Sequence, residues 1–401
     1  MNQIINTNRK GVTHLSTYGL ALFLFLTPFE YPLADLVTIS PLRIVGLLAM
    51  GLAALDILMQ KTLKLDYRIM YVAFWLIYGL ITYLWAIDET RWQSYYSIYL
   101  NNALMFLLFS MVLYTKHEAD VLKKSMVLGV VVLLLYMTFV PNAVIYSDYQ
   151  NRLTLNAGKD GLDQNYLAAL MLVPFGIVFY NLCNANQKKM CKIISIIFCL
   201  VIVYYVLLTG SRSGLIAILL IMLLSMNTSW KTRLSIGIPV LLIMLVVFTF
   251  VLQYIPEELL ERFSLKALTG QEAESGTRLL IWEHALTSLK DLKWIFGYGV
   301  GASQSVIGNI LGVGKDMAIH NHYIASLVEV GLCGSILLTL PVIKMIKKVL
   351  RKDKSVATAF FGILLMAFFI DVLTTKFFWS AMILLSICCS ARNNISTEEV
   401  S

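Results

Sequence analysis

Three residues of this sequence could do chemistry together, although they lie far apart in the chain. Arg212 stands in the sequence TGSRSG, Arg278 in SGTRLLIW and His320 in HNHY. Each lies at the edge of an apolar segment or in the one long polar loop, where an ionised side chain costs far less than in mid-bilayer. Two fixed cations and one histidine facing the same compartment indicate phosphate binding and proton transfer.

The composition is that of a polytopic membrane protein. The chain has 401 residues, of which 58% are hydrophobic and 14% are charged, whereas a soluble domain is about half apolar and about a quarter charged. We predict an all-α transmembrane bundle of about twelve helices, because apolar segments long enough to cross a bilayer recur along the whole chain. These segments lie near 15–34, 41–59, 69–87, 97–114, 124–141, 165–183, 191–208, 213–228, 234–253, 323–343, 356–372 and 376–391. The first lacks a small-residue cleavage site, so we expect it to be retained.

Lysine and arginine in the short loops predict the orientation. In the twelve-helix arrangement these cations gather on one side, which the positive-inside rule makes cytoplasmic, and both termini fall there. The basic run from Lys344 to Lys354 is interpreted as a topological anchor rather than a specific lipid or nucleic-acid site. The net charge of +8 therefore reflects topology, and the predicted partner is the lipid bilayer, not nucleic acid.

Residues 1–401 are predicted to form a single integral membrane domain with two long extracytoplasmic loops, 142–164 and 254–322. Long ordered loops are usually functional. The second loop should contain amphipathic helices, one over 256–263 and one capped by Thr277. The apolar face of the second helix is predicted to comprise Leu279, Trp282, Leu286 and Leu289.

Each arginine has a functional and a structural interpretation. Arg278 would stand in the first turn of the helix capped by Thr277, where free N–H groups and the helix dipole add to its guanidinium in holding an anion. Alternatively, it is a solvated arginine that snorkels from an amphipathic helix. Arg212 lies in a turn of about four residues between two apolar helices, where it either binds an anion or serves as an interfacial anchor.

His320 is a candidate general base. Asn321 is a good cap for the helix that follows, which places the imidazole at the outer mouth of the bundle. Two nearby arginines would disfavour the imidazolium and keep the ring neutral, although a histidine beside a cap is often structural. Glu329 follows on the same face in an apolar segment, so we expect it to orient a polar group or pair with an arginine.

Two weaker patterns lead to no site. GYGVG at 297–301 resembles part of a dinucleotide loop but opens no βαβ unit, so it is interpreted as a flexible turn. The other histidines form no set with metal-ligand spacing, and no metal or other cofactor is predicted.

Together these motifs resemble the O-antigen ligase and polymerase superfamily of bacterial membrane glycosyltransferases. The resemblance covers roughly residues 150–340 and rests on the order of TGSRSG, GTRLLIWEHAL, FGYGVGAS and HNHYIASLVEVGLCG. The stretch RLTLNAGKDGLDQNYL, from Arg152 to Leu167, is similar to the arginine-glycine-acid-asparagine stretch of the family ahead of its sixth helix. The family often has a proline before that asparagine, whereas this chain has Gln164 before Asn165.

The resemblance implies a glycosyltransferase-C-like bundle that transfers sugar from a polyprenyl diphosphate-linked donor to an acceptor. The reaction would be inverting and metal-independent, at the outer face of the bacterial plasma membrane. On this hypothesis the pyrophosphate is bound by arginines and His320 deprotonates the acceptor hydroxyl. The implied pyrophosphate-binding residues are Arg212, Arg278 and Arg152, and the supporting residues are Glu329, Asn321, Tyr323 and Asn165.

The acceptor divides the superfamily. A polymerase extends a lipid-linked repeat unit at its non-reducing end, whereas a ligase transfers the glycan to a lipopolysaccharide core. FGYGVG followed by HNHY resembles the polymerases more, so a polymerase of O-antigen or capsule is predicted, with the ligase as the alternative and a chain-length regulator as a further partner. A secondary transporter is a third possibility, but it would hold its polar groups near the midplane in repeated halves.

Overall fold

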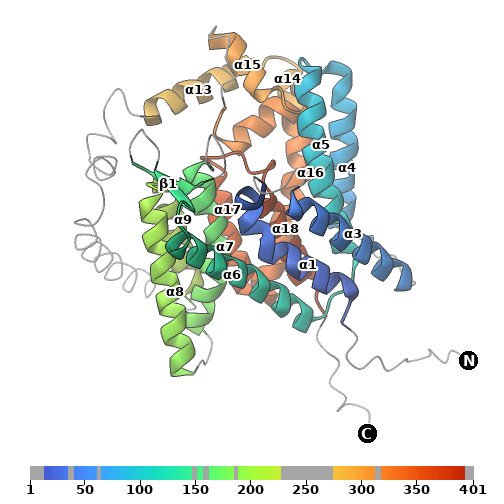
Figure 1. The fold of residues 1–401 in the computed structure, drawn as a ribbon. Helices are drawn as coiled ribbons and strands as arrows, with labels where there is room; N and C mark the ends of the chain where they lie inside the picture. Colours follow the sequence, from blue (N-terminus) through green and yellow to red (C-terminus); the bar gives the residue numbers. More distant parts are fainter. Residues whose placement is uncertain are drawn as a thin grey trace, which may run out of the picture.

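Helices make up almost all of the regular structure that the computed structural model describes (Figure 1). The described residues are 13–34, 40–60, 65–146, 151–156, 162–184, 188–226, 274–311 and 318–392. The prediction of an all-α, polytopic protein is confirmed, and the chain is an integral membrane protein.

The elements before the first polar loop are α1 (Leu15–Leu26), η1 (Thr27–Phe29), α2 (Glu30–Ala34), α3 (Pro41–Met59), α4 (Tyr67–Ile81), η2 (Thr82–Trp85), α5 (Glu89–Met111) and α6 (Lys116–Phe139). An antiparallel hairpin of β1 (Val144–Tyr146) and β2 (Leu153–Leu155) lies in that loop, with Val144 opposite Leu155. It is followed by α7 (Gln164–Asn184), α8 (Lys189–Leu208) and α9 (Arg212–Ser225). The remaining described helices are α13 (Glu274–Ser288), α14 (Lys293–Phe296), α15 (Ala302–Leu311), α16 (His322–Lys352), α17 (Lys354–Met366) and α18 (Lys376–Ser390).

Eleven of the twelve predicted segments coincide with helices. The ninth segment, 234–253, and the helix predicted over 256–263 lie outside the described residues. Within the described part of the chain, six helices are long and apolar enough to cross a membrane, namely those at Pro41–Met59, Tyr67–Trp85, Lys116–Phe139, Gln164–Asn184, Lys189–Leu208 and His322–Lys352. Helices α9, α17 and α18 are apolar but shorter.

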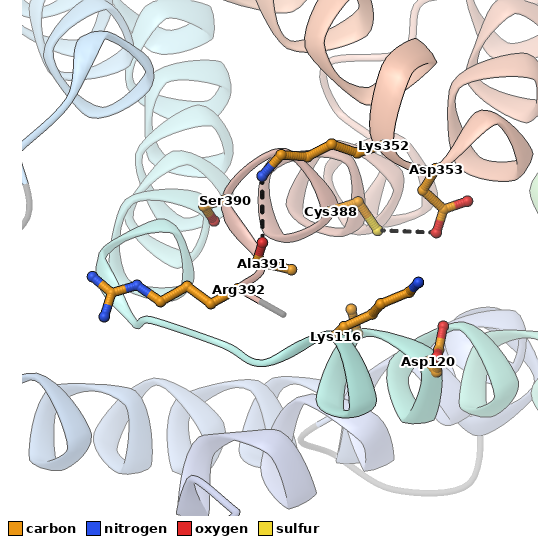
Figure 2. A pocket seen from close by; sticks show the side chains of 9 residues that line it. Lys116, Asp120, Lys352, Asp353, Cys388, Ser390, Ala391 and Arg392 are labelled. Carbon is orange, nitrogen blue, oxygen red and sulfur yellow. Dashed lines mark hydrogen bonds between the residues drawn. The ribbon is translucent and has the colours of Figure 1, made fainter. Parts of the chain in front are cut away.

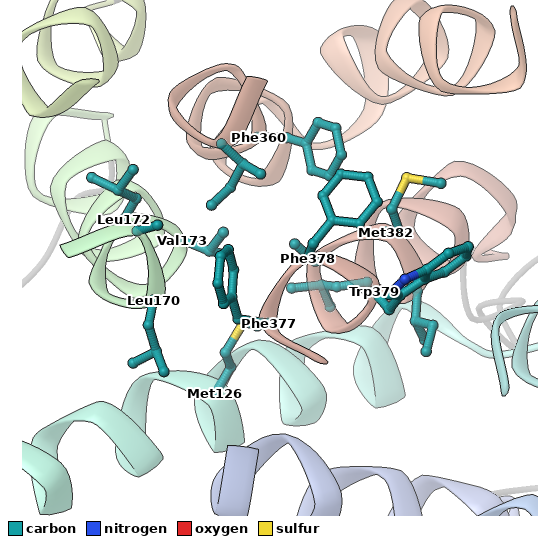
Figure 3. Close-up of a cluster of buried hydrophobic side chains, with 14 of the residues drawn as sticks. Met126, Leu170, Leu172, Val173, Phe360, Phe377, Phe378, Trp379 and Met382 are labelled. Carbon is teal, nitrogen blue, oxygen red and sulfur yellow. The ribbon is translucent and has the colours of Figure 1, made fainter. Parts of the chain in front are cut away.

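Helices α7, α17 and α18 form the centre of the buried core (Figure 3). In α18 every side chain from Phe377 to Cys389 is buried, and α7 is buried from Leu167 to Ile177. A helix that is apolar on all sides belongs in the interior of a bundle. These helices provide the rigid neighbours against which α9 and α16 begin.

The two ends of the bundle carry different parts of the chain (Figure 1). At one end, His14 binds Glu118 at 2.8 Å and the Arg392 carbonyl accepts from the Lys116 N–H at 3.0 Å, so the first and last described residues both contact the start of α6. At the opposite end lie α13, α14 and α15. Helix α16 has 31 residues and joins the two ends.

Candidate active site

Arg152 and the turn before Arg212 meet at the start of α7. The Arg152 guanidinium donates to the Thr209 carbonyl at 2.8 Å and to Oδ1 of Asn165 at 3.4 Å. The same Oδ1 accepts from the Ser211 hydroxyl at 2.8 Å, and Ser211 is the N-cap of α9, of which Arg212 is the first residue. Since Arg152, Asn165 and Ser211 are all buried, these bonds fix the backbone that carries Arg212.

His320 precedes the cap of α16, as predicted. Oδ1 of Asn321 accepts from the N–H groups of Tyr323 at 3.0 Å and Ile324 at 3.2 Å. His320 itself is partly exposed and has a left-handed backbone, with φ of 51°. Such a conformation costs about 1–2 kcal/mol for a residue other than glycine, and residues of this kind cluster at active sites.

Helix α13 packs on the segment immediately before His320. The indole N–H of Trp282 donates to the Ile319 carbonyl at 2.9 Å, and Ile281, Ala285 and Leu289 form one buried cluster with Ile319. Arg278 lies four residues before Trp282 and therefore on the same side of the helix, one turn nearer its N-terminus. The structure thus brings the helix of Arg278 against the backbone of His320.

Two details predicted for α13 are wrong. The helix begins at Glu274, so Thr277 is not its cap and Arg278 is its fifth residue rather than a member of its first turn. The free N–H groups of the first turn, which we expected to help Arg278 bind an anion, therefore lie one turn before Arg278. The buried face is also displaced, because Leu279 is 61% exposed whereas Ile281 is 4% exposed.

The Arg212 and His320 regions are joined through Asp371, which the sequence analysis overlooked. Nδ1 of His322 lies 3.4 Å from Oδ1 of Asp371, and the Asp371 carbonyl accepts from the Tyr166 hydroxyl at 3.0 Å. Tyr166 follows Asn165 directly in α7. An acid within the apolar segment 356–372 was the signal that could have identified Asp371, because intramembrane acids are costly and usually functional.

Glu329 binds side chains of α15 and α5 rather than pairing with an arginine. Its buried carboxylate accepts from the Ser303 hydroxyl at 2.6 Å and the Tyr99 hydroxyl at 3.2 Å, which links α16 to α15 and α5. Tyr323, the other supporting residue of this helix, donates to the Leu364 carbonyl of α17 at 2.8 Å. Both side chains therefore fix the first turns of α16.

The GYGVG segment is docked on α16, so its interpretation as a flexible turn is wrong. Gly331 has φ of 61° and interrupts α16. The N–H groups of Tyr298 and Gly299 bind the carbonyls of Val328 and Glu329 at 2.8 Å and 2.9 Å. A Cβ at Gly297 would collide with the Glu329 carbonyl, and a Cβ at Gly331 with that of Ile295. Only glycine permits this approach of two backbones.

A cavity of about 590 Å³ opens beside these helices. Its lining includes Thr287, Ser288, Lys290, Tyr298 and Asn309, together with three aliphatic side chains. In the described residues, no three His, Cys, Asp or Glu side chains gather in a way that could hold a metal ion.

Comparison with protein families identifies the region that carries these features. Residues 196–339 match the family model described as O-antigen ligase. Over these residues the chain is similar to the O-antigen ligase and polymerase superfamily. A search of the curated proteins found no match.

The region matched by the O-antigen ligase family runs from α8 to Thr339 in α16, and it contains Arg212, Arg278, His320 and Glu329. Arg152 and Asn165 lie before it and join it through Thr209 and Ser211. The match therefore supports a membrane enzyme of the glycosyltransferase kind.

Proposed function

We propose that this protein is a polysaccharide polymerase of O-antigen or capsule. It transfers a polyprenyl diphosphate-linked glycan to the non-reducing end of a lipid-linked repeat unit, without a metal ion and with inversion. The observation that carries the proposal is the series of contacts from Ser211 through Asn165, Tyr166 and Asp371 to His322. These contacts link the turn before Arg212 to the start of α16, which follows His320, and they support our assignment of a phosphate-binding group and a proton acceptor to one site.

The arginines stabilise the leaving group. As the C1–O bond of the donor breaks, negative charge develops on the polyprenyl diphosphate, and guanidinium groups bind such oxygens with two parallel hydrogen bonds. Arg212 and Arg278 bind the pyrophosphate, and Arg152 contributes from the position directly before β2. Fixed cations in a site with little water stabilise developing charge strongly, because no solvent has to reorganise.

His320 activates the acceptor. The acceptor hydroxyl attacks C1 from the face opposite the pyrophosphate, a new C1–O bond forms, and the proton of the hydroxyl passes to the imidazole of His320. This step requires the neutral imidazole. Asn321 and Tyr323 position His320 through the start of α16, while Asn165 and Glu329 hold the elements around it.

The site faces the extracytoplasmic side of the bacterial plasma membrane, and both termini are cytoplasmic. The basic residues near the start of α6 and the end of α16, which include Lys116 and Lys352, support this orientation by the positive-inside rule. They lie at the end of the bundle opposite α13–α15 (Figure 1).

The ligase is the second candidate, because the description of the matched family is O-antigen ligase. Purified protein in liposomes distinguishes the candidates when it receives lipid-linked repeat units either alone or with a lipid A-core acceptor. A polymerase lengthens the glycan in the first reaction, whereas a ligase forms product only in the second. Uptake of solute driven by an ion gradient, without any glycan transfer, would instead identify a transporter and overturn both.

A further inference from the structure

A second cavity lies at the end of the bundle where the described termini meet (Figure 2). It has a volume of about 520 Å³, which is in the range of small-molecule sites. Its walls come from the first turn of α6, the end of α16 and the last turn of α18. The lining residues are Lys116, Ala119, Asp120, Lys352, Asp353, Cys388, Ser390, Ala391 and Arg392.

The two carboxylates of this cavity, Asp120 and Asp353, both form a salt bridge with Lys123. Nζ of Lys123 lies 2.6 Å from Asp120 and 2.6 Å from Asp353. Burial opposes the ionisation of Asp353, but the ammonium of Lys123 outweighs it and holds the pKa of that carboxyl below its ordinary value. Asp353 is thus ionised at neutral pH, and both acids are bound to Lys123.

Three further cations line the cavity, and in the described part of the chain none of them pairs with a carboxylate. Lys352 donates to the Ala391 carbonyl at 3.3 Å, a neutral acceptor (Figure 2). The Lys116 and Arg392 side chains are exposed. With Lys123, four cations stand against the two acids Asp120 and Asp353, so the cavity has an excess of two positive charges.

We propose that this cavity binds a phosphate group, presented by the head group of an anionic phospholipid or by a soluble phosphate. Lys116 and Lys352 supply ammonium groups, and Arg392 supplies a guanidinium that can bind two phosphate oxygens. The three residues lie where α6 begins and where α16 and α18 end. The ends of apolar transmembrane helices lie at the depth of the lipid head groups. Basic pockets between helices at this depth bind anionic head groups.

The arrangement could not be seen in the sequence, because Lys116 and Arg392 are 276 residues apart by their numbering. Two backbone hydrogen bonds bring these segments together. The Lys116 N–H donates to the Arg392 carbonyl at 3.0 Å, and the Arg392 N–H donates to the Tyr114 carbonyl at 3.2 Å. The basic run after Lys344 still serves as an anchor, and Lys352 is the member of it that lines the cavity.

The test compares two triple variants that remove the same charges. One is Lys116→Gln/Lys352→Gln/Arg392→Gln, and the control is Lys347→Gln/Lys348→Gln/Arg351→Gln, whose side chains are exposed on α16 and lie outside the cavity. Binding of fluorescent phosphatidylglycerol is measured with full-length protein in phosphatidylcholine nanodiscs. We expect about tenfold weaker binding in the cavity variant and less than about a twofold change in the control.

Competition by millimolar inorganic phosphate identifies the source. Displacement of the labelled lipid assigns the site to soluble phosphates, and resistance to displacement assigns it to lipid head groups.

Equal losses in the two triple variants would overturn the proposal, because general surface charge would then explain binding. Binding that appears only after residues 393–401 are deleted would also overturn it, since the chain's own Glu398 and Glu399 would then be the occupant. The single variant Lys116→Gln, at an exposed position, should bind about threefold more weakly and provides a milder check.

Discussion

The first turns of α16 and its last turns carry polar side chains of opposite kinds. At the start, His322 and Glu329 are buried and bind Asp371, Ser303 and other partners on neighbouring elements. At the end, Lys347, Lys348 and Arg351 are exposed.

Buried polar groups cost desolvation and persist only where bonds compensate for it, whereas basic side chains at a helix C-terminus and membrane surface are stabilised by their surroundings. The first turns of α16 therefore fix the geometry of the neighbouring elements, whereas the basic side chains of its last turns suit a membrane surface. Substitutions at the first end should change turnover, and comparable substitutions at the second should change it little.

The largest expected effect is the loss of His320. His320→Ala should reduce polymer formation from lipid-linked repeats by about 10³-fold, because a general base contributes roughly 10²- to 10⁴-fold. His320→Asn should be equally inactive, and it is the better-folded variant because asparagine tolerates the left-handed backbone at this position. Binding of the donor, measured separately, should stay within about threefold of the original protein.

The matched control for His320 is His284→Ala on α13, which is partly buried at the same end of the bundle. It should leave the rate within about twofold, as expected for a substitution outside the catalytic groups. Turnover that persists in both His320 variants would remove this residue as the base.

The next largest effect should come from replacing arginine by lysine. Arg212→Lys and Arg278→Lys keep the charge but lose the planar group that binds two oxygens, and each should reduce the rate by about 10²-fold. Arg351→Lys, at the other end of α16, should have the same rate as the original protein. If all three variants polymerise alike, bidentate binding of the pyrophosphate is not the role of Arg212 and Arg278.

A smaller effect on turnover and a clear effect on stability are expected at Gly331. Gly331→Ala places a Cβ against the Ile295 carbonyl at a φ of 61°, which should cost about 3 kcal/mol from the left-handed backbone and the collision together. The thermal unfolding midpoint in detergent should fall, and the rate at a temperature where the protein is folded should fall about tenfold, because the GYGVG segment no longer docks.

Gly51→Ala in α3 is the control for this glycine. Apart from the adjacent backbone of its own helix, no heavy atom lies within 4 Å of a Cβ added there. Alanine favours a helix over glycine by up to about 1 kcal/mol. The unfolding midpoint should stay the same or rise. Equal behaviour of the two alanine variants would show that the break in α16 is not needed for stability.

The sequence allowed prediction of features that depend on nearby residues. The apolar segments predicted the helices, because in a bilayer such a chain forms its backbone hydrogen bonds within helices. Asn321 predicted the start of α16, because its side chain can cap the helix. The start of α13 was missed by four residues, because Thr277 resembled a cap and placed the first helical residue at Arg278, although the helix extends back to Glu274. Caps compete with tertiary packing, which local sequence does not describe.

Features that depend on which helices are neighbours were not predictable. The bonds among Arg152, Asn165 and Ser211 require the packing of β2, α7 and α9. A glycine such as Gly331 is common in transmembrane helices, so nothing in its sequence context indicated a left-handed residue or a docked GYGVG segment. Asp371 is the one site residue whose signal, an acid in an apolar segment, was present and overlooked.

The smallest expected effect concerns the contact between α13 and the segment before His320. Trp282→Phe removes the hydrogen bond to the Ile319 carbonyl but keeps an aromatic ring in the cluster. The free energy that holds the backbone beside His320 in place should therefore fall by about 1 kcal/mol. We expect about a fivefold lower rate with little change in the unfolding midpoint. Trp294→Phe, at a position that is 40% exposed, should alter neither quantity. An unchanged rate in Trp282→Phe would mean that α13 need not be fixed against His320, and the placement of Arg278 beside the base would lose its main support.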